Sequence, residues 1–262
     1  MSGYEERRSH ALQLANQRRS GGKLSFLAHW AKIIVVSLAL FVVIRAFGVE
    51  AFKIASGSME HTLFEGDFLL INKLVYGAGI SGHKFPALHS PRRGDVIVFT
   101  YPVDPRLNYI KRIVGIPGDT LEMRNAVLIR NNRVVREDYI QRSTDDADQS
   151  DEEFRWQSAY LVGGASVENY RPSRNNWGPL VVPSHDYFVL GDNRDDSLDS
   201  RYWGFVPAEN IVGRPLLIYW SVNREVEDDE NPDPNAKLER FVRSITRMFR
   251  DARWKRTMTV VR

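Results

Sequence analysis

The chain contains no cysteine among its 262 residues. This absence excludes disulfide bonds, thiol nucleophiles and cysteine-ligated metals. The chain also lacks a strong excess of one charge, because 36 Lys and Arg stand against 33 Asp and Glu, for a net charge of +3. Such a small excess does not indicate a nucleic-acid partner, and none is expected.

Several motifs of catalytic and metal sites are also missing. No H-E-x-x-H spacing is present, which disfavours a metal hydrolase, and no G-x-S-x-G elbow surrounds Ser58. The acidic stretch at 191–207 fails the test for an EF-hand calcium loop. Counted from Asp192, its sixth position is Ser197 instead of glycine and its twelfth is Trp203 instead of glutamate. We therefore expect no metal and no cofactor.

Long apolar runs are rare, and only residues 26–49 suggest a membrane segment. The uncharged part runs from Ile33 to Ile44, with Lys32 and Arg45 at its ends. This is shorter than the roughly 20 residues that a spanning helix needs, but the two basic side chains can snorkel outward and lengthen the span. A cleaved signal peptide is the alternative, with "AFG" at 46–48 as its cleavage site. We favour an uncleaved anchor, because the preceding polar stretch is longer than the usual start of a signal peptide.

The basic residues of segment 1–25 predict the orientation of this anchor. Positive charge is retained on the cytoplasmic side of a membrane. We therefore expect a single-pass protein of the cytoplasmic membrane, with its N-terminus in the cytoplasm and every residue after 49 outside.

Short apolar or alternating runs follow the anchor, and turn-forming residues bound each run. They are "FLLINK" (68–73), "DVIVFT" (95–100), "NYIKRIVG" (108–115), "YFVLGD" (187–192) and "PLLIYWSV" (215–222). No long amphipathic helix interrupts them. The fold class is therefore mainly β, with a closed or sandwiched, barrel-like antiparallel sheet formed by residues 50–122 and 180–222.

The remaining segments are more polar. Residues 123–179 predict an inserted, smaller β subdomain with a hairpin around Asn131 and Asn132, and residues 223–237 an acidic linker. Residues 238–262 predict a basic amphipathic helical tail, either docked on the protein or lying on an anionic membrane. The apolar positions of this tail are Leu238, Phe241, Val242, Ile245, Met248 and Phe249.

The stretch "IASGSMEHTL" at 54–63 raises the question of a nucleophile. Ser58 lies between a glycine and a methionine, and a serine hydroxyl needs an adjacent base to become nucleophilic at neutral pH. A Ser-His-Asp triad would need a histidine, but no pattern directs one at Ser58, not even His61. The six histidines are His10, His29, His61, His83, His89 and His185.

Lys111 is a better candidate for the base. It lies in "LNYIKRIVGIPGD", where strand alternation places it on one face with Tyr109 and Ile113. Desolvation by such neighbours lowers the pKa of a lysine, and a neutral amine can accept the proton of Ser58. The alternative is a solvated lysine that protects a sheet edge, and the spacing alone does not decide between them.

The stretch "GDNRDDSLDSRYWGFVP" at 191–207 crowds acidic and basic residues beside an aromatic run. We expect it to leave a strand and pack on the core. Charges placed there need partners, which predicts pairs between aspartate and arginine.

These stretches together resemble the boxes of the type I signal peptidases, the membrane-bound leader peptidases. "SGSMEHTLFEGDFLLINK" is similar to the nucleophile box, "RRGDVIVFTYP" and "NYIKRIVGIPGDTLE" to two central boxes, and "GDNRDDSLDSRYWGFVP" to the last one. Their order behind an N-terminal anchor is also that of the family. The resemblance covers about residues 49–122 and 180–222, but not the head, the polar insertion or the tail.

The resemblance implies a serine endopeptidase with a Ser/Lys dyad that removes signal peptides from exported preproteins after Ala-x-Ala ends. Ser58 matches the nucleophile and Lys111 the general base. The implied partners are preprotein substrates and the lipid bilayer. Further matching positions are Ser56 in the oxyanion hole, Ser197 beside the lysine, the ion pairs Asp199–Arg201 and Asp192–Arg112, and Phe52, Ile54, Met59, Leu63, Tyr109 and Ile110 in pockets for small side chains.

Two departures from the family pattern concern the nucleophile loop. Ala55 and His61 stand where the family often has proline. Proline stiffens a loop by fixing φ, so its absence loosens the approach to Ser58 without removing a catalytic group. Two other functions stay open: a membrane-anchored β-rich binding or assembly protein, and a Ser/Lys processing protease of the same fold with another substrate. The oligomeric state is not indicated.

Overall fold

A computed structural model of the chain describes residues 26–41, 48–77, 79–80, 83–84, 87–142, 148, 150, 152–162, 167–223 and 250–261. The chain divides into two compact units, Met1–Gly48 and Val49–Arg262. In the first unit residues 26–41 form a helix whose large apolar side chains are exposed. Among the described residues, no helix combines the length and the hydropathy that a membrane span requires. Residues 42–47 of the predicted anchor lie outside the described residues.

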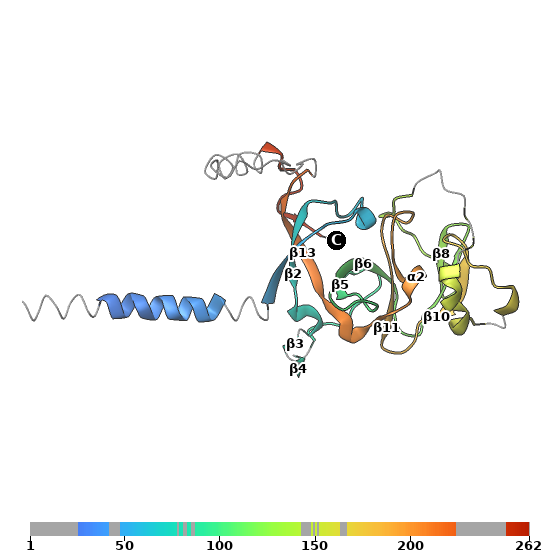
Figure 1. The fold of residues 1–262 in the computed structure, drawn as a ribbon, viewed down its shortest axis with the longest axis horizontal. Helices are drawn as coiled ribbons and strands as arrows, with labels where there is room; N and C mark the ends of the chain where they lie inside the picture. The colour runs from blue at the N-terminus through green and yellow to red at the C-terminus, as the bar shows by residue number, and fades with distance from the viewer. Residues whose placement is uncertain are drawn as a thin grey trace, which may run out of the picture. The chain divides into compact units, whose positions relative to one another are not determined.

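An antiparallel sheet of eight strands dominates the second unit (Figure 1). Its order is β1-β2-β13-β5-β6-β11-β12, and β14 pairs with β13. The five apolar runs of the sequence lie in β2, β5, β6, β11 and β13, so the prediction of a mainly β antiparallel fold is confirmed. The strands are β1 (Val49–Lys53), β2 (Asp67–Asn72), β5 (Val96–Thr100), β6 (Asn108–Gly115), β11 (Asp186–Leu190), β12 (Val206–Pro207), β13 (Ile211–Ser221) and β14 (Thr259–Val260).

The centre of this sheet is buried on both faces. Along β5, Val96 and Val98 belong to one core cluster, whereas Ile97 and Phe99 belong to another. A strand with two buried faces requires apolar residues without alternation, which explains the continuous run at 96–99. The register pairs Ile97 with Lys111 of β6, so this lysine is held on a rigid, buried strand.

A second sheet has the order β10-β7-β8-β9 and is formed by β7 (Thr120–Arg124), β8 (Val127–Arg130), β9 (Arg133–Val134) and β10 (Trp177–Val181). Asn131 and Asn132 have φ of 53° and 62° and form the hairpin between β8 and β9, because asparagine tolerates the left-handed region. Val114 of β6 and Phe188 of β11 share a core cluster with residues of this sheet. The division into a core and an inserted subdomain therefore stays a prediction.

The other elements of the second unit are short. A two-stranded hairpin, β3 (Gly79–Ile80) and β4 (His83–Lys84), stands apart from both sheets. The helices are the 3₁₀ turns η2 (Gly57–Met59), η3 (Leu74–Tyr76), η4 (Glu152–Tyr160), η5 (Val167–Asn169) and η6 (Ala208–Asn210), and the one-turn helix α2 (Ser200–Trp203).

The C-terminal segment differs from its prediction. Residues 224–249, with most of the predicted acidic linker and half of the predicted helical tail, lie outside the described residues. Residues 251–261 form turns and the strand β14, so the helical prediction is wrong for them. The β-branched residues Thr257, Thr259, Val260 and Val261 favour a strand. Val261 is also buried in the core, and this burial stabilises the extended conformation.

Candidate active site

Ser58 lies on the segment 54–66 that joins β1 to β2, which we call the nucleophile turn. The backbone of Ile54 is bonded to Gly66 and Asp67, which closes the base of this turn. The carbonyl of Met59 accepts hydrogen bonds from the backbone N–H groups of residues 62 and 63. Ser58 itself is within the 3₁₀ turn η2 and is 7% exposed. The hydroxyl of Ser58 is therefore held by a compact backbone rather than by a mobile loop.

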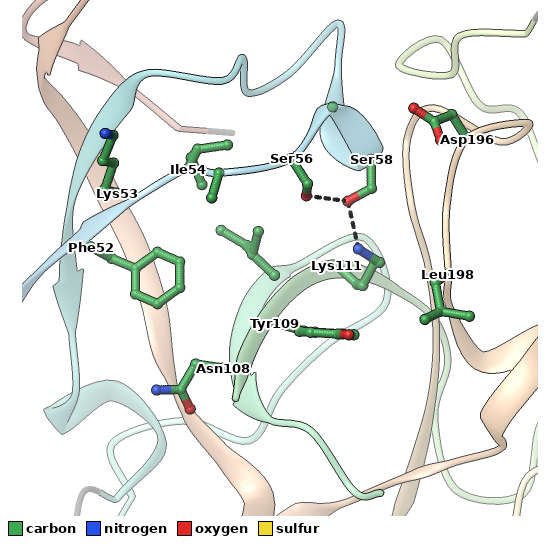
Figure 2. Close-up of a pocket in the computed structure, with 13 residues that line it drawn as sticks. Phe52, Lys53, Ile54, Ser56, Ser58, Asn108, Tyr109, Lys111, Asp196 and Leu198 are labelled. Atoms are coloured by element: carbon green, nitrogen blue, oxygen red, sulfur yellow. Dashed lines mark hydrogen bonds between the residues drawn. The ribbon is translucent and has the colours of Figure 1, made fainter. Parts of the chain in front are cut away.

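Lys111 reaches this hydroxyl from β6, which is distant in sequence. Its Nζ donates a 2.6 Å hydrogen bond to Ser58 Oγ, and Ser56 Oγ lies 3.3 Å from the same oxygen. Figure 2 shows the three side chains converging at the wall of a cleft. The side chain of Lys111 is 4% exposed, so the solvated alternative for this lysine is excluded by the structure.

The surroundings of Lys111 favour its neutral form. Burial lowers its pKa to about 8, although the carboxylates of Asp199 and Asp192 raise it. At pH 7 a group with such a pKa is neutral in about a tenth of the molecules, compared with far fewer for a solvated lysine. The pair thus combines a hydroxyl with an amine that can accept its proton.

No histidine of the described residues hydrogen-bonds to Ser58. His61 is exposed and adopts a φ of 79° on the far part of the turn. The side chains in hydrogen-bond contact with Ser58 Oγ are Lys111 and Ser56. The arrangement is therefore a Ser/Lys pair and not a histidine triad.

Arg112, the neighbour of Lys111, forms a buried ion pair with Asp192. Its Nε and Nη2 donate bonds of 2.8 and 2.7 Å to the two carboxylate oxygens. Thr62 Oγ1 also donates to this carboxylate at 2.5 Å. A bidentate pair fixes geometry as well as charge, so Asp192 connects β6 with the nucleophile turn.

Asp199 and Arg201 form a second buried pair. Two guanidinium nitrogens donate to the carboxylate at 2.8 Å each, and the backbone N–H of Gly191 donates at 3.1 Å. Burial by itself raises the pKa of Asp199. The charge and hydrogen bonds of Arg201 lower the pKa by more than burial raises it, so the pKa lies below its usual range. Asp199 is therefore a permanent anion beside the site.

The loop 191–199 packs directly on the nucleophile turn. Asn193 donates from its backbone to the carbonyl of Ser58 at 3.1 Å and from its side chain to that of Gly57 at 3.2 Å. A Cβ on Gly191 would lie 2.2 Å from Ser197 Oγ and 2.5 Å from the carbonyl oxygen of Ser58. Only glycine permits this approach. Sequence reasoning missed both Gly191 and Asn193, although "GDN" directly after a strand was the available signal.

Ser197, which the resemblance places beside the lysine, is buried in this loop. No described residue meets full hydrogen-bond geometry with its Oγ, although its hydroxyl lies close enough to Asp199 to help lower the pKa of that carboxyl. The position of Ser197 as the serine that orients the lysine amine therefore stays a prediction.

A cleft of about 370 Å³ extends from the Ser58–Lys111 pair. In Figure 2, Phe52 and Ile54 lie to one side of this pair, and Asp196 and Leu198 lie to the other. Sequence reasoning did not identify Asn108, Asp196 or Leu198 as lining residues. The full lining is Phe52, Lys53, Ile54, Ala55, Ser56, Gly57, Ser58, Asn108, Tyr109, Ile110, Lys111, Asp196 and Leu198.

Two predicted pocket residues do not line this cleft. Met59 and Leu63 are both 0% exposed and belong to the core cluster that also contains Ile71. Both side chains pack in this core cluster instead of lining the cleft. Met59 and Leu63 therefore anchor the nucleophile turn to the core and do not contact the cleft.

Comparison with known proteins finds relatives among the signal peptidases. The family described as signal peptidase, peptidase S26, matches residues 27–220. A signal peptidase I of Pseudomonas aeruginosa is 38% identical over 216 residues, which cover 76% of this chain and 74% of that protein. A signal peptidase I of Aquifex aeolicus is 36% identical, and the match covers 81% of this chain and 91% of that protein. One of Buchnera aphidicola from Acyrthosiphon pisum is 34% identical and covers 79% of each chain.

Proposed function

Because this chain belongs to the signal peptidase family, peptidase S26, we propose that it removes N-terminal signal peptides from exported preproteins. The reaction is endoproteolysis by a serine enzyme. The observation that carries the proposal is the 2.6 Å contact between Lys111 Nζ and Ser58 Oγ at the wall of an open cleft. A serine with an adjacent base is the arrangement that nucleophilic attack on a peptide carbonyl requires.

In this mechanism Ser58 is the nucleophile and Lys111 the general base. The neutral amine accepts the hydroxyl proton while Oγ attacks the scissile carbonyl. The resulting ammonium then donates its proton to the leaving amine, which frees the mature protein. Lys111 next activates a water that hydrolyses the acyl-enzyme, since the same group serves as acid and base in turn.

The oxyanion of the tetrahedral intermediate is bound by Ser56 Oγ and the backbone N–H of Ser58. Ser56 lies on the cleft side of the nucleophile, with its Oγ 3.3 Å from Ser58 Oγ. Donors arranged before the reaction need no reorganisation when the charge develops, and losing one typically costs about 10²–10³ in rate.

The apolar part of the cleft selects small side chains. Phe52, Ile54, Tyr109 and Ile110 narrow the lining next to Ser58. Small residues at the Ala-x-Ala end of a signal peptide enter such a space, whereas larger ones overlap with these walls.

The segment 26–49 anchors the enzyme as a single span of the cytoplasmic membrane. Its N-terminus lies in the cytoplasm and unit Val49–Arg262 lies on the other side, as the basic head segment indicates. A preprotein is held in the same bilayer by its own apolar core. Sharing the membrane therefore raises the effective concentration of the cleavage site.

The decisive experiment uses a preprotein with an Ala-x-Ala site in lipid. We expect the wild type to cut after the small residue, Ser58→Ala and Lys111→Ala to be inactive, and His61→Ala to retain activity. His61→Ala is the matched control, because His61 is a titratable neighbour on the same turn.

Two other outcomes would change the proposal. If Lys111→Ala cuts normally while His61→Ala does not, the activity stands but the dyad is wrong. If a well-folded wild type cuts nothing, the alternative of a membrane-anchored binding or assembly protein takes its place.

A further inference from the structure

We propose that the C-terminal segment 250–261 is a brace of the nucleophile turn, and that Arg256 is a positioning residue for Ser58. The segment lies beyond residue 220, where the family match ends. The inference rests on the proposed peptidase function and adds a residue to it. It is carried by the contacts of two arginines with the turn at 60–67.

Asp67 is the point at which the brace meets the turn. This residue is 0% exposed and lies at the start of β2. Arg256 Nη2 donates to its carboxylate at 2.6 Å, and Ser221 Oγ donates at 2.6 Å. Asp67 in turn accepts the backbone N–H of Phe64 at 2.9 Å. The carboxylate therefore joins the C-terminal segment, β13 and the turn in one network.

Arg256 also contacts the turn directly. Its Nη2 donates to the carbonyl of Thr62 at 3.0 Å, and its guanidinium stacks over the ring of Phe64 at 4.3 Å. Arg253 supports the same turn by donating to the carbonyl of Glu65, and it also donates, at 2.8 Å, to the carbonyl of Val222 directly after β13. Backbone carbonyls without such donors would need other partners in a partly buried site.

The hydrogen bond from Arg256 to Thr62 is connected to the catalytic pair through further hydrogen bonds. Thr62 Oγ1 donates to Asp192, whose carboxylate pairs with Arg112, and Arg112 is adjacent to Lys111 on β6. The N–H of Thr62 donates to the carbonyl of Met59, the residue after the nucleophile. Arg256 thus fixes Thr62. Thr62 is hydrogen-bonded to Met59 beside the nucleophile and, through Asp192 and Arg112, is connected to strand β6, which carries Lys111.

The brace is itself attached to the main sheet. β14 pairs with β13 through Val260 and Thr259, and Val261 enters the core. Ala252 forms an isolated bridge with Val222. These attachments hold Arg253 and Arg256 at fixed positions between them, which distinguishes the segment from a basic tail in solution.

The test compares Arg256→Gln, Arg256→Lys and Arg250→Gln in the full-length enzyme. Arg250 is the matched control because it lies in the same segment but is exposed and pairs only with the adjacent Asp251 in the contacts described. Cleavage of an Ala-x-Ala preprotein is measured per titrated active site, with kcat and KM separated and the pH varied. The pKa of Lys111 is measured separately, from the pH dependence of its acetylation by trace acetic anhydride.

We expect Arg256→Gln to lower kcat about ten- to a hundred-fold, because small displacements of reacting groups have effects of this size. KM should change little, and the pKa of Lys111 should rise from about 8 toward that of a solvated lysine as water reaches the amine. Arg256→Lys should lie between Arg256→Gln and the wild type, and Arg250→Gln should equal the wild type.

Two results would overturn the inference. One is a loss of melting temperature and of titrated sites in Arg256→Gln with unchanged kcat per site and unchanged pKa of Lys111, which would make Arg256 merely structural. The other is an Arg256→Gln variant indistinguishable from Arg250→Gln. If the wild type cleaves nothing, the proposed function fails, while the acetylation of Lys111 in the same variants still decides whether Arg256 positions the site.

Discussion

At the scale of single residues, the charge of one amine decides whether Ser58 is activated. Lys111 is almost fully buried, and this burial outweighs the two aspartates that favour its ammonium form. Arg201 lowers the pKa of Asp199, so this carboxylate does not take the proton from the lysine, and Asp192 is ion-paired with Arg112. The base is therefore available at a moderately alkaline pH.

The first prediction concerns pH. Because the neutral amine is the active form, kcat/KM should rise as the pH increases through about 8, the pKa of Lys111. Asp196 lines the cleft and raises this pKa through its negative charge. Asp196→Asn should therefore move the acid limb of the profile to lower pH and increase the rate at pH 7.

The control for this prediction is Asp138→Asn, which neutralises an exposed carboxylate paired with Arg136. It should leave the acid limb in place. An acid limb that moves to higher pH in Asp196→Asn, or that moves equally in both variants, would contradict the assignment of the limb to Lys111.

At the level of single residues, the two ion pairs that the sequence suggested are present in the structure. The resemblance to signal peptidases suggested the pairs Asp192–Arg112 and Asp199–Arg201, and both are ion-paired here. Contacts made by glycine and asparagine backbones were missed, since no pattern in one sequence reveals which backbone another segment will approach. The inward orientation of Met59 was missed for the same reason.

At the scale of elements, the loop 191–199 and the short helix α2 are held together by one buried ion pair. Asp199 caps α2 by accepting from the backbone N–H of Arg201 and also pairs with its guanidinium. Its other oxygen binds the N–H of Gly191 at the opposite end of the loop. The pair thus sets the shape of the loop that packs on the nucleophile turn.

The prediction at this scale concerns stability. Asp199→Asn should lower the free energy of unfolding by about 3–5 kcal/mol, because it leaves the buried charge of Arg201 uncompensated. Urea denaturation followed by tryptophan fluorescence measures this change, with Asp138→Asn as the exposed control.

The same pair determines a pH dependence of stability. The folded-state pKa of Asp199 is lowered, so its contribution is present above the unfolded value of about 3.9 and is lost as the pH falls through the folded pKa. The stability difference between wild type and Asp199→Asn should therefore shrink in acid. A difference that grows in acid, or none at neutral pH, would contradict this account.

The strands were predictable as elements, but the C-terminal segment was not. Continuous or alternating apolar runs indicate strands locally, as in β5 and β6. The tail has helical spacing only at 238–249, and the two residues of β14 are strand because β13 offers them an edge. Tertiary pairing of this kind overrides local propensity.

At the scale of the whole molecule, the cleft and its supports lie within one of the two units. Every lining residue of the cleft falls in Val49–Arg262. We therefore expect chemistry and membrane location to be separable properties of the enzyme.

The prediction at this scale uses the fragment Val49–Arg262. It should cleave a soluble Ala-x-Ala peptide with the kcat/KM of the full chain, because no group of the site is lost. It should cleave a preprotein embedded in vesicles less efficiently than the full chain, because the shared bilayer no longer concentrates the two partners. Equal efficiency on the embedded preprotein would argue against segment 26–49 as the anchor.

The position of the brace in the chain has a consequence for biogenesis. A ribosome makes Ser58 well before Arg256, so the turn at 60–67 lacks this partner until translation has passed residue 256. At that stage the hydroxyl of Ser58 and the amine of Lys111 would be less firmly aligned than in the complete fold. The full rate would then be reached only after residues 250–261 have been made and have paired with β13.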